Sequence, residues 1–552
     1  MPTIPSAHLK APGSAVVVAV ASPKQARETR PHPKRREIWD EVYPDSLKEP
    51  EYESTSYEYH VFSRRKKWLI IVLVGLTGTL PGLTFNMFLP AVDTIAKDLV
   101  VGPAAVGATI ASYLALQGTT SMVLVPLSDS VGRRPVLIFT LLLYVIASVV
   151  LSMTSSIYLL FVLRGAQAIG MAPIIQISRA VLDDISLPSE RNVFSSFFQR
   201  YHSMLFVSAP AMGGLFLSTR PFQFIFVFLL SVSAAAFIAI AFCLPETARS
   251  IVGNGSVPAT GIHVPWAVWF RPLKDSDGES EDVKRSEDGL QERSDVDFAE
   301  PLRLFREKDT VAGLVFAGVV FAVWMMVTVS TPGMFKKAFD LNDVMLGLAF
   351  VANFLGVIVG SMVMDRILAR NYYDAAYKYT EEHQLPPSHL LNGKDLPADF
   401  LLEHTRLWHL IWLVPILVVT VSGYGFTLTY PSATSRPGWI LLPMALQFII
   451  AAAAHAVCTI QQTLITDLWN QNEQASTNAG NLAKYLLAAL AAGLIQLQLD
   501  GMGAWSSFVS LGLVIMTCLV LPVAQWYWGG EWRAEREAKI EILNRMKDRP
   551  LV

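Results

Sequence analysis

Long apolar runs alternate with short polar stretches from residue 68 to residue 529. A helix that crosses the apolar part of a bilayer takes roughly 20 residues. We predict a membrane helix in each of twelve windows, at about 68–90, 104–126, 135–153, 157–177, 197–218, 222–244, 310–330, 344–367, 406–430, 438–460, 479–498 and 506–529. The fifth window is the weakest, because Gln199, Arg200 and His202 lie at its start. It stays in the set because an apolar, glycine-rich stretch follows, as in many membrane helix interfaces.

A charged segment divides the twelve windows into two sets of six. Residues 245–309 carry 23 charged side chains in 65 residues, and 19 of these lie between Asp275 and Asp309. Such dense charge is typical of a solvated linker. We therefore predict a disordered N-terminal tail at 1–67, a six-helix half at 68–244 and this linker at 245–309. A second six-helix half follows at 310–529, with a polar cytoplasmic loop at 371–405, and the C-terminal tail is 530–552. Two such halves are the arrangement of many secondary transporters.

Lys and Arg residues gather in alternate loops, which predicts the orientation of the chain in the membrane. They precede the first window and follow the second, fourth, eighth and twelfth, for example at Arg133, Arg191, Arg370 and Arg533. Both tails and the charged linker are therefore placed in the cytoplasm. The glycosylation sequon at Asn254 lies on that side, so we expect it to stay unmodified.

The composition excludes several classes of protein. Only 16% of the residues are charged, whereas a soluble protein carries roughly 25%. The net charge of -2 gives no basic excess for binding nucleic acid. Cys243, Cys458 and Cys518 all lie in apolar runs, which excludes a disulfide framework and a cysteine-based metal site. The sequence contains no phosphate-binding loop, no zinc-protease motif and no serine-nucleophile elbow, so we predict neither an enzyme nor a cofactor or metal.

The junction between the second and third windows carries a motif. The segment 127–135, L-S-D-S-V-G-R-R-P, resembles the G-x-L-x-D-R-x-G-R-R signature of the major facilitator superfamily. The resemblance implies a gate at the cytoplasmic face, built from Asp129, Gly132, Arg133 and Arg134. Val125 stands where the family has Gly, and Ser130 stands where it usually has Arg. We therefore expect a weaker charge relay at this gate.

Three further motifs extend the resemblance. R-G-A-Q-A-I-G from Arg164 is similar to the family's R-x-x-Q-G-x-G, which implies proton coupling or substrate contact at Arg164. An arginine in mid-membrane costs roughly 2.5–3.5 kcal/mol, so it should face a polar interior. A-P-A-M-G-G resembles the antiporter signature G-P-x-x-G-G, which implies a bending helix and export, through Pro210, Gly213 and Gly214. The segment 244–255 resembles the exit from the sixth span of fungal quinidine-resistance-type exporters.

The chain thus resembles the twelve-span drug:proton antiporter branch of that superfamily. The resemblance implies an all-α integral membrane protein with twelve transmembrane helices in two six-helix halves. It also implies proton-coupled export of a small-molecule substrate by alternating access, the substrate being a drug, a secondary metabolite or an organic acid. We expect a monomer in the lipid bilayer of a fungal plasma membrane, with the vacuolar membrane as the alternative. Uptake by a symporter of the same fold, a membrane-embedded enzyme and a transporter-like sensor remain open as other functions.

Few polar groups lie inside the predicted spans, and polar groups there mark transport pathways. His455 and Lys484 are candidates for proton coupling, since a free imidazole titrates near neutral pH. Lys484 has a second interpretation, in which its side chain reaches the cytoplasmic interface. Candidates for the substrate cavity are Asn86, Gln117 and Gln167. Acids near the span ends are expected to be caps or gate partners (Asp183, Asp184 and Asp467). Three aromatic residues, Phe85, Phe354 and Tyr113, have two interpretations: they line a hydrophobic cavity or, as we expect, they face lipid.

Overall fold

The computed structural model describes residues 62–254, 257, 259–269, 298–384, 397, 399–430, 440–469 and 472–547. These residues all belong to one compact unit, Tyr59–Val552. Most of the predicted N-terminal tail, the middle of the charged linker, the centre of the loop 371–405 and the last residues of the chain lie outside the described part. So do Gly255 and Ser256 of the glycosylation sequon.

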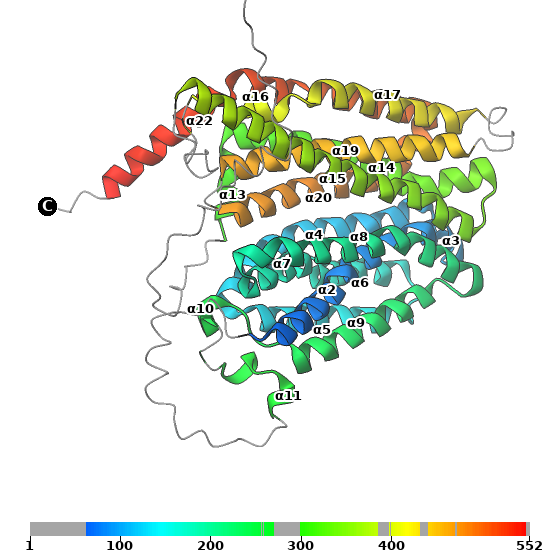
Figure 1. The fold of residues 1–552 in the computed structure, drawn as a ribbon. Helices are drawn as coiled ribbons and strands as arrows, with labels where there is room; N and C mark the ends of the chain where they lie inside the picture. The colour runs from blue at the N-terminus through cyan, green and yellow to red at the C-terminus, as the bar shows by residue number, and fades with distance from the viewer. Residues whose placement is uncertain are drawn as a thin grey trace, which may run out of the picture. The chain divides into compact units, whose positions relative to one another are not determined.

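The first half of the chain forms six long helical segments (Figure 1). Their bounds are α2 Arg64–Asn86, α4 Pro103–Val131, α5 Arg133–Leu151, α6 Ile157–Met171 with α7 Ile174–Ile185, α8 Pro188–Thr219 and α9 Gln223–Cys243. A short turn η1 (Leu89–Ala91) and helix α3 (Val92–Asp98) connect α2 to α4. Pro173 separates α6 from α7 because proline lacks the backbone N–H that a continuous helix needs.

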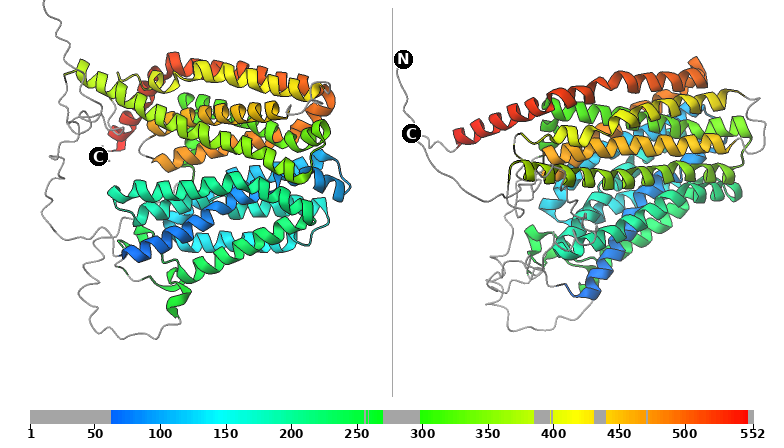
Figure 2. Two further views of the ribbon diagram at one scale, coloured as in Figure 1. Left: turned by 45° about the vertical axis from the view of Figure 1, so that its right-hand side comes forward. Right: turned by 45° about the horizontal axis from the view of Figure 1, so that its top comes forward.

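The second half repeats this pattern. Its bounds are α14 Lys308–Phe339, α15 Asp343–Glu382, α16 Leu402–Leu407 with α17 Leu410–Thr429, α19 Leu441–Leu468, α20 Glu473–Met502, and α21 Ala504–Cys518 with α22 Val520–Lys547. Several helices are longer than the sequence windows, and two of them extend into segments predicted to be polar: α15 enters the predicted loop at 371–405, and α22 continues through the predicted tail. The end of α22 extends past the ends of the neighbouring helices (Figure 2).

Eleven helical segments among the described residues are long and apolar enough to cross a membrane. The segment that falls short is α8, which corresponds to the weak fifth window. It has 32 residues, so it is about 48 Å long, enough to span a bilayer. It packs against α2 in its own half and against α15 in the other half, as the other membrane helices do with their neighbours. Charged residues in its first turns lower the mean hydropathy of α8, but the helix still packs within the bundle.

Both ends of the predicted solvated linker are buried, which corrects the sequence-based expectation for these residues. Glu246 is 2% exposed and Asp309 is 3% exposed. Asp309 pairs with Arg536 of α22, and the Gln525 side chain donates a hydrogen bond to the Asp309 carbonyl (2.7 Å). A count of charges along the chain did not reveal that these two acids have specific partners. These contacts fix α22 to the start of α14.

Candidate functional site

Arg164 is completely buried in α6 and is held by its own half of the chain. Its Nη1 donates to Gln167 Oε1 (3.1 Å) and makes a long contact with the Thr84 carbonyl (3.5 Å). The Gln167 amide in turn donates to Ser148 Oγ (3.0 Å). The guanidinium carbon lies 4.2 Å from the ring centre of Phe88 and 4.4 Å from that of Tyr113. Aromatic faces attract a cation, but they do not neutralise it.

Several polar atoms around Arg164 have no hydrogen-bond partner. They are Arg164 Nε and Nη2 and the Tyr113 hydroxyl; Asn86 Oδ1 on α2 is also buried without a partner. The other end of Asn86 donates to the Phe206 carbonyl (2.9 Å), which ties α2 to α8. Buried donors and acceptors are nearly always paired, so a group of unpaired ones indicates a place for water or a ligand. Gln117, one turn from Tyr113 on α4, keeps part of its surface accessible.

His455 and Lys484 lie together in the second half. Lys484 on α20 is within electrostatic range of His455 and of Cys458 on α19. His455 Nε2 is buried without a partner, and the imidazole packs edge-on against Trp324, with ring centres 4.6 Å apart. The structure thus brings together the two residues that the sequence proposed for proton coupling. Because both neighbours of Lys484 lie in mid-helix, the interpretation of its side chain as interfacial is not supported.

The expectation that three aromatic residues face lipid is wrong for two of them. Tyr113 and Phe354 are fully buried. Tyr113 covers Arg164, and Phe354 meets Phe206 of the other half, with ring centres 5.0 Å apart. The third residue, Phe85, packs against Tyr113 (5.6 Å). The side of each helix that faces the interior was not predictable, because apolar residues occur all round these helices.

The motif between α4 and α5 forms an ion-pair cluster at the ends of the helices that are predicted to be cytoplasmic. Arg133 pairs with Asp129 and with Asp184 of α7 (Nε–Oδ2 3.3 Å). Asp129 also accepts a hydrogen bond from Gln474 Nε2 at the start of α20 (3.1 Å), which links the two halves on this side. Of the other predicted gate partners, Asp183 pairs with Arg191 (3.0 Å), and Asp467 pairs with Arg406 (2.7 Å).

Glu246 is the centre of a second cluster at this end, and the sequence did not identify it as a site residue. Its carboxylate accepts the backbone N–H groups of Arg133 (2.9 Å) and Arg134 (3.3 Å), the first residues of α5. His263 Nδ1 lies 3.1 Å from its Oε2. Gly132 has φ +113°, and a Cβ there would lie 2.5 Å from Glu246 Oε2. A glycine is therefore required where the carboxylate caps the helix.

Replacing Glu246 with Gln is expected to lower the thermal stability of the purified protein. Both carboxylate oxygens accept hydrogen bonds, so an amide would turn a donor towards N–H groups and leave them unpaired, at a cost of about 1–3 kcal/mol. Thermal unfolding in detergent measures the change. Glu531→Gln, at an exposed position on α22, is the matched control. Equal melting temperatures for the Glu246 variant and the wild type would show that the carboxylate does not hold this junction.

Through its glycine motif, α8 packs closely against its own half and against α15 of the other half. A Cβ on Gly213 would lie 2.5 Å from the Met87 carbonyl. A Cβ on Gly347 of α15 would lie 2.5 Å from the Pro210 carbonyl and 3.2 Å from the Gly214 Cα. Small residues let helix backbones come into direct contact. The antiporter-like motif is thus part of the interface between α8 and α15.

A lysine joins the halves at the other end of the bundle, the side predicted to be extracellular. Lys336 Nζ at the end of α14 lies 2.7 Å from Asp343 Oδ1 and 3.3 Å from Asp93 Oδ2 of α3. It also donates to Thr94 Oγ1 (3.3 Å). Its side chain is 17% exposed, and it borders a cavity of about 670 Å³ between α3, α8 and the α14–α15 turn. We call Lys336, Asp93 and Asp343 the outer latch.

Replacing Lys336 with Met is expected to favour separation of the halves at the outer end. The change removes the cation that Asp93 and Asp343 share, although Asp93 keeps its ion pair with Lys97 (2.9 Å). The loss of such a partly exposed pair shifts the equilibrium by about 1 kcal/mol, roughly fivefold. A cysteine introduced by Ser330→Cys, a buried position on α14, should react faster with an impermeant thiol reagent. Lys337→Met, at the exposed neighbouring position, should leave the rate unchanged. An unchanged rate in the Lys336 variant would contradict the role of the latch.

No group of three or more potential metal ligands occurs in the part of the chain that the structure describes. The candidate site therefore consists of two cationic centres inside the bundle, one in each half, with polar contacts between the halves at both ends. Arg164 is fully buried, whereas Lys484 keeps part of its surface accessible. Such an arrangement can bind a charged molecule between the halves.

The architecture matches known transporters. The family model of the Major Facilitator Superfamily matches residues 74–492. The crystal structure of a D-xylose–proton symporter superposes with a TM-score of 0.54 at 14% identity, covering 82% of this chain and 97% of that one. A bacterial homolog of the human lysosomal transporter Spinster, in an inward-facing conformation, gives a TM-score of 0.52 at 13% identity, covering 86% and 99%. At these identities the likeness shows the fold alone.

Two curated relatives are fungal transporters. Citrate exporter 1 of Aspergillus niger is 30% identical over 487 residues, which cover 88% of this chain and 90% of the exporter. MFS antiporter QDR1 of Candida albicans is 26% identical over 471 residues, which cover 84% of this chain and 88% of the antiporter. Both similarities extend over nearly the whole described part of the chain.

Proposed function

The chain belongs to the major facilitator superfamily, and on that basis we propose that it exports a small organic anion in exchange for protons. Membership of this family, together with the helical bundle, confirms the predicted fold class. It also confirms that the chain is a multi-pass membrane transporter and not an enzyme. The anionic substrate, the protons, the monomeric state and the plasma membrane are the parts that we propose.

The observation that carries the proposal is a buried cation without a counter-ion. Arg164 is 0% exposed, and neither it nor Lys484 has a carboxylate partner among the described residues. An isolated charge in an apolar environment is strongly unfavourable unless an opposite charge joins it. A substrate carboxylate would supply that charge and the missing acceptors for Arg164 Nε and Nη2. A cationic drug would instead be repelled by both centres.

The similarity to a citrate exporter supports the same substrate class. A fork-shaped guanidinium binds a carboxylate through two parallel hydrogen bonds, and a lysine adds a point charge. Carboxylates are therefore the anions that this pair of residues fits best. We accordingly favour organic acids over the drugs and neutral metabolites that the sequence alone left open.

The energetics favour outward movement of an anion. The cell interior is negative, and moving one charge across 100 mV changes the free energy by about 2.3 kcal/mol. Each unit of pH difference adds about 1.4 kcal/mol for every proton that moves inward. His455 and Lys484 are the proposed sites of proton binding, because they are the titratable pair nearest mid-membrane in the second half. Binding of the anion and binding of protons at adjacent sites would be linked electrostatically, because each changes the charge that the other meets.

Transport assays in cells test the direction and the substrate class. The wild type and Arg164→Ala are produced in a yeast host loaded with labelled citrate or gluconate, or with a cationic dye. We expect the wild type to release the carboxylates at least about tenfold faster than the variant, a difference of about 1.4 kcal/mol. Dye release should not differ between them. Faster release of the dye alone would contradict the proposal, and faster entry of carboxylate would favour the uptake symporter.

The same cells can be used to determine the membrane in which the protein resides. A fluorescent fusion at the cell boundary, together with labelled acid in the medium, agrees with export through the plasma membrane. A signal confined to the vacuole, with the acid retained inside the cell, would support the vacuolar alternative.

A further inference from the structure

An aromatic cluster surrounds the cationic centre of the second half. Its rings come from four helices: α14, α15, α19 and α20. The ring centres of Trp324 and His455 are 4.6 Å apart at an interplanar angle of 87°. Phe321 lies 5.9 Å from His455 and 5.7 Å from Tyr485, and Trp324 lies 6.5 Å from Phe354. We call these residues, Phe321, Trp324, Phe354, His455 and Tyr485, the aromatic wall.

Trp324 is fixed in orientation by a closed set of hydrogen bonds. Its indole Nε1 donates to Asn353 Oδ1 (2.9 Å), and Asn353 Nδ2 donates to Thr328 Oγ1 (3.0 Å). Thr328 Oγ1 in turn donates to the Trp324 carbonyl (2.9 Å). The three side chains are at most 3% exposed. The ring is therefore held by Asn353 as well as by packing, because rotation would leave buried polar groups unpaired.

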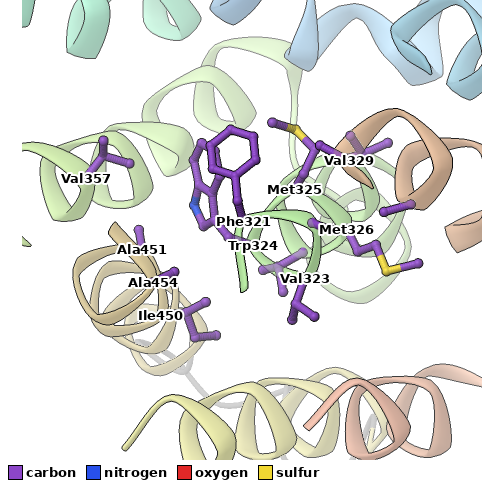
Figure 3. Packing of buried hydrophobic residues seen from close by; sticks show 14 of the residues in the cluster. Phe321, Val323, Trp324, Met325, Met326, Val329, Val357, Ile450, Ala451 and Ala454 are labelled. Atoms are coloured by element: carbon purple, nitrogen blue, oxygen red, sulfur yellow. The ribbon is translucent and has the colours of Figure 1, made fainter. Parts of the chain in front are cut away.

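The wall lies on the side of α14 that faces the rest of the transport site. Phe321 and Trp324 leave α14 together, whereas Val323 and Met326 point away from them (Figure 3). Phe354 meets Phe206 of the first half, so the wall continues to the seam between the halves. The unpaired His455 Nε2 and the unpaired Lys484 stand beside it. Aromatic rings and cationic groups thus lie together inside the bundle, where the rings of Phe321, Trp324 and Phe354 are buried in this conformation.

We propose that this wall makes the transporter selective for carboxylates that carry a planar ring, over acids such as citrate and gluconate that carry none. The inference rests on the proposed function and specifies its substrate class. An aromatic group stacked on Trp324 and Phe321 gains apolar contact while its carboxylate is held by the cations. Citrate has three charged groups and no flat apolar surface, so contact with the wall would leave polar groups without partners. Asn353 acts as a positioning residue, which sets the plane of Trp324.

Competition between three anions in proteoliposomes tests the inference. The probes are p-aminohippurate, with a ring and one carboxylate; gluconate, with one carboxylate and no ring; and citrate. We expect kcat/KM of the wild type for p-aminohippurate to exceed that for gluconate about tenfold, as stacking of about 1.4 kcal/mol would give. Because gluconate and p-aminohippurate each carry one carboxylate, a difference between them reports the ring and not the charge.

Substitutions in the aromatic wall test whether it causes the preference for p-aminohippurate over gluconate. Trp324→Leu should raise the KM for p-aminohippurate about tenfold and leave kinetics for gluconate within about twofold, whereas Trp324→Phe should retain most of the preference. Asn353→Leu should raise the same KM without changing kcat, because the wall is present but no longer oriented. Trp505→Leu, at a 45% exposed position on α21, is the matched control.

The outcomes separate this inference from the function on which it rests. Transport of citrate or gluconate by the wild type at least as well as p-aminohippurate would overturn the inference and leave anion export standing. An equal loss for all three anions in Trp324→Leu and Trp324→Phe would also overturn it, since the tryptophan would then be structural. Transport of none of the three anions by the wild type would overturn the export of anions and the inference together.

Discussion

Substitution of Arg164 by Ala is expected to reduce carboxylate efflux about 100-fold, the loss of about 3 kcal/mol of charge-assisted hydrogen bonding to the substrate. The amount of folded protein should not fall. Removing a buried, uncompensated cation relieves a desolvation penalty, so the melting temperature should stay level or rise. Efflux of labelled citrate and thermal unfolding, measured on the same preparation, give the two results.

Two further variants separate a binding role from a structural one. Arg164→Lys keeps the charge without the fork, so we expect intermediate efflux. Arg370→Ala, at a 71% exposed side chain paired with Asp374, is the control for loss of an arginine. If Arg164→Ala unfolded at a clearly lower temperature and kept its efflux per folded molecule, Arg164 would be a structural residue bridging Thr84 and Gln167.

Substitution of Gly347 by Leu is expected to abolish transport in protein that still reaches the membrane. The Pro210 carbonyl would lie 2.5 Å from the new Cβ, and backbone atoms cannot move aside as a flexible side chain can. Overpacking costs about 1–3 kcal/mol, which shifts the equilibrium between conformations roughly 5- to 150-fold away from the one in which α8 and α15 touch. The rate of carboxylate efflux measures the loss of transport. Faster labelling of the Ser330→Cys reporter from outside measures the shift.

Gly423→Leu provides the matched control for this substitution. Gly423 lies inside α17, where the nearest atom to an added Cβ, on Leu446, is 3.9 Å away. We expect near-normal efflux there. Normal efflux in Gly347→Leu would show that close contact between α8 and α15 is not a step in transport.

The helical bundle was predictable because the apolar runs are long and the linker is densely charged. Even the weakness of the fifth window has its counterpart in α8. Polarity along the chain also indicated Arg164, His455 and Lys484, since polar groups are rare within spans. These predictions need only composition within a window, which the sequence supplies directly.

Features that depend on helix rotation or on distant partners were not predictable. Tyr113 and Phe354 face the interior, although nothing in their apolar helices distinguishes one side from another. Glu246 and Asp309 were not recognised as buried because Arg133 and Arg536, the partners that join them to the bundle, lie over 100 residues away in sequence. The outer latch was not predicted because a single lysine at a helix end forms no recognisable sequence motif. The hydrogen bond between Trp324 and Asn353 likewise joins different helices and required coordinates.

Purified protein in proteoliposomes with an imposed pH gradient tests the central claim most directly. Vesicles oriented with the cytoplasmic face inside, loaded with labelled carboxylate and a pH-sensitive dye, are diluted into acidic medium. The account predicts that anion leaves while protons enter, that both flows stop together in Arg164→Ala, and that neither occurs in empty vesicles. Movement of the anion at the same rate with and without the gradient, with no entry of protons beyond the leak, would contradict proton-coupled export.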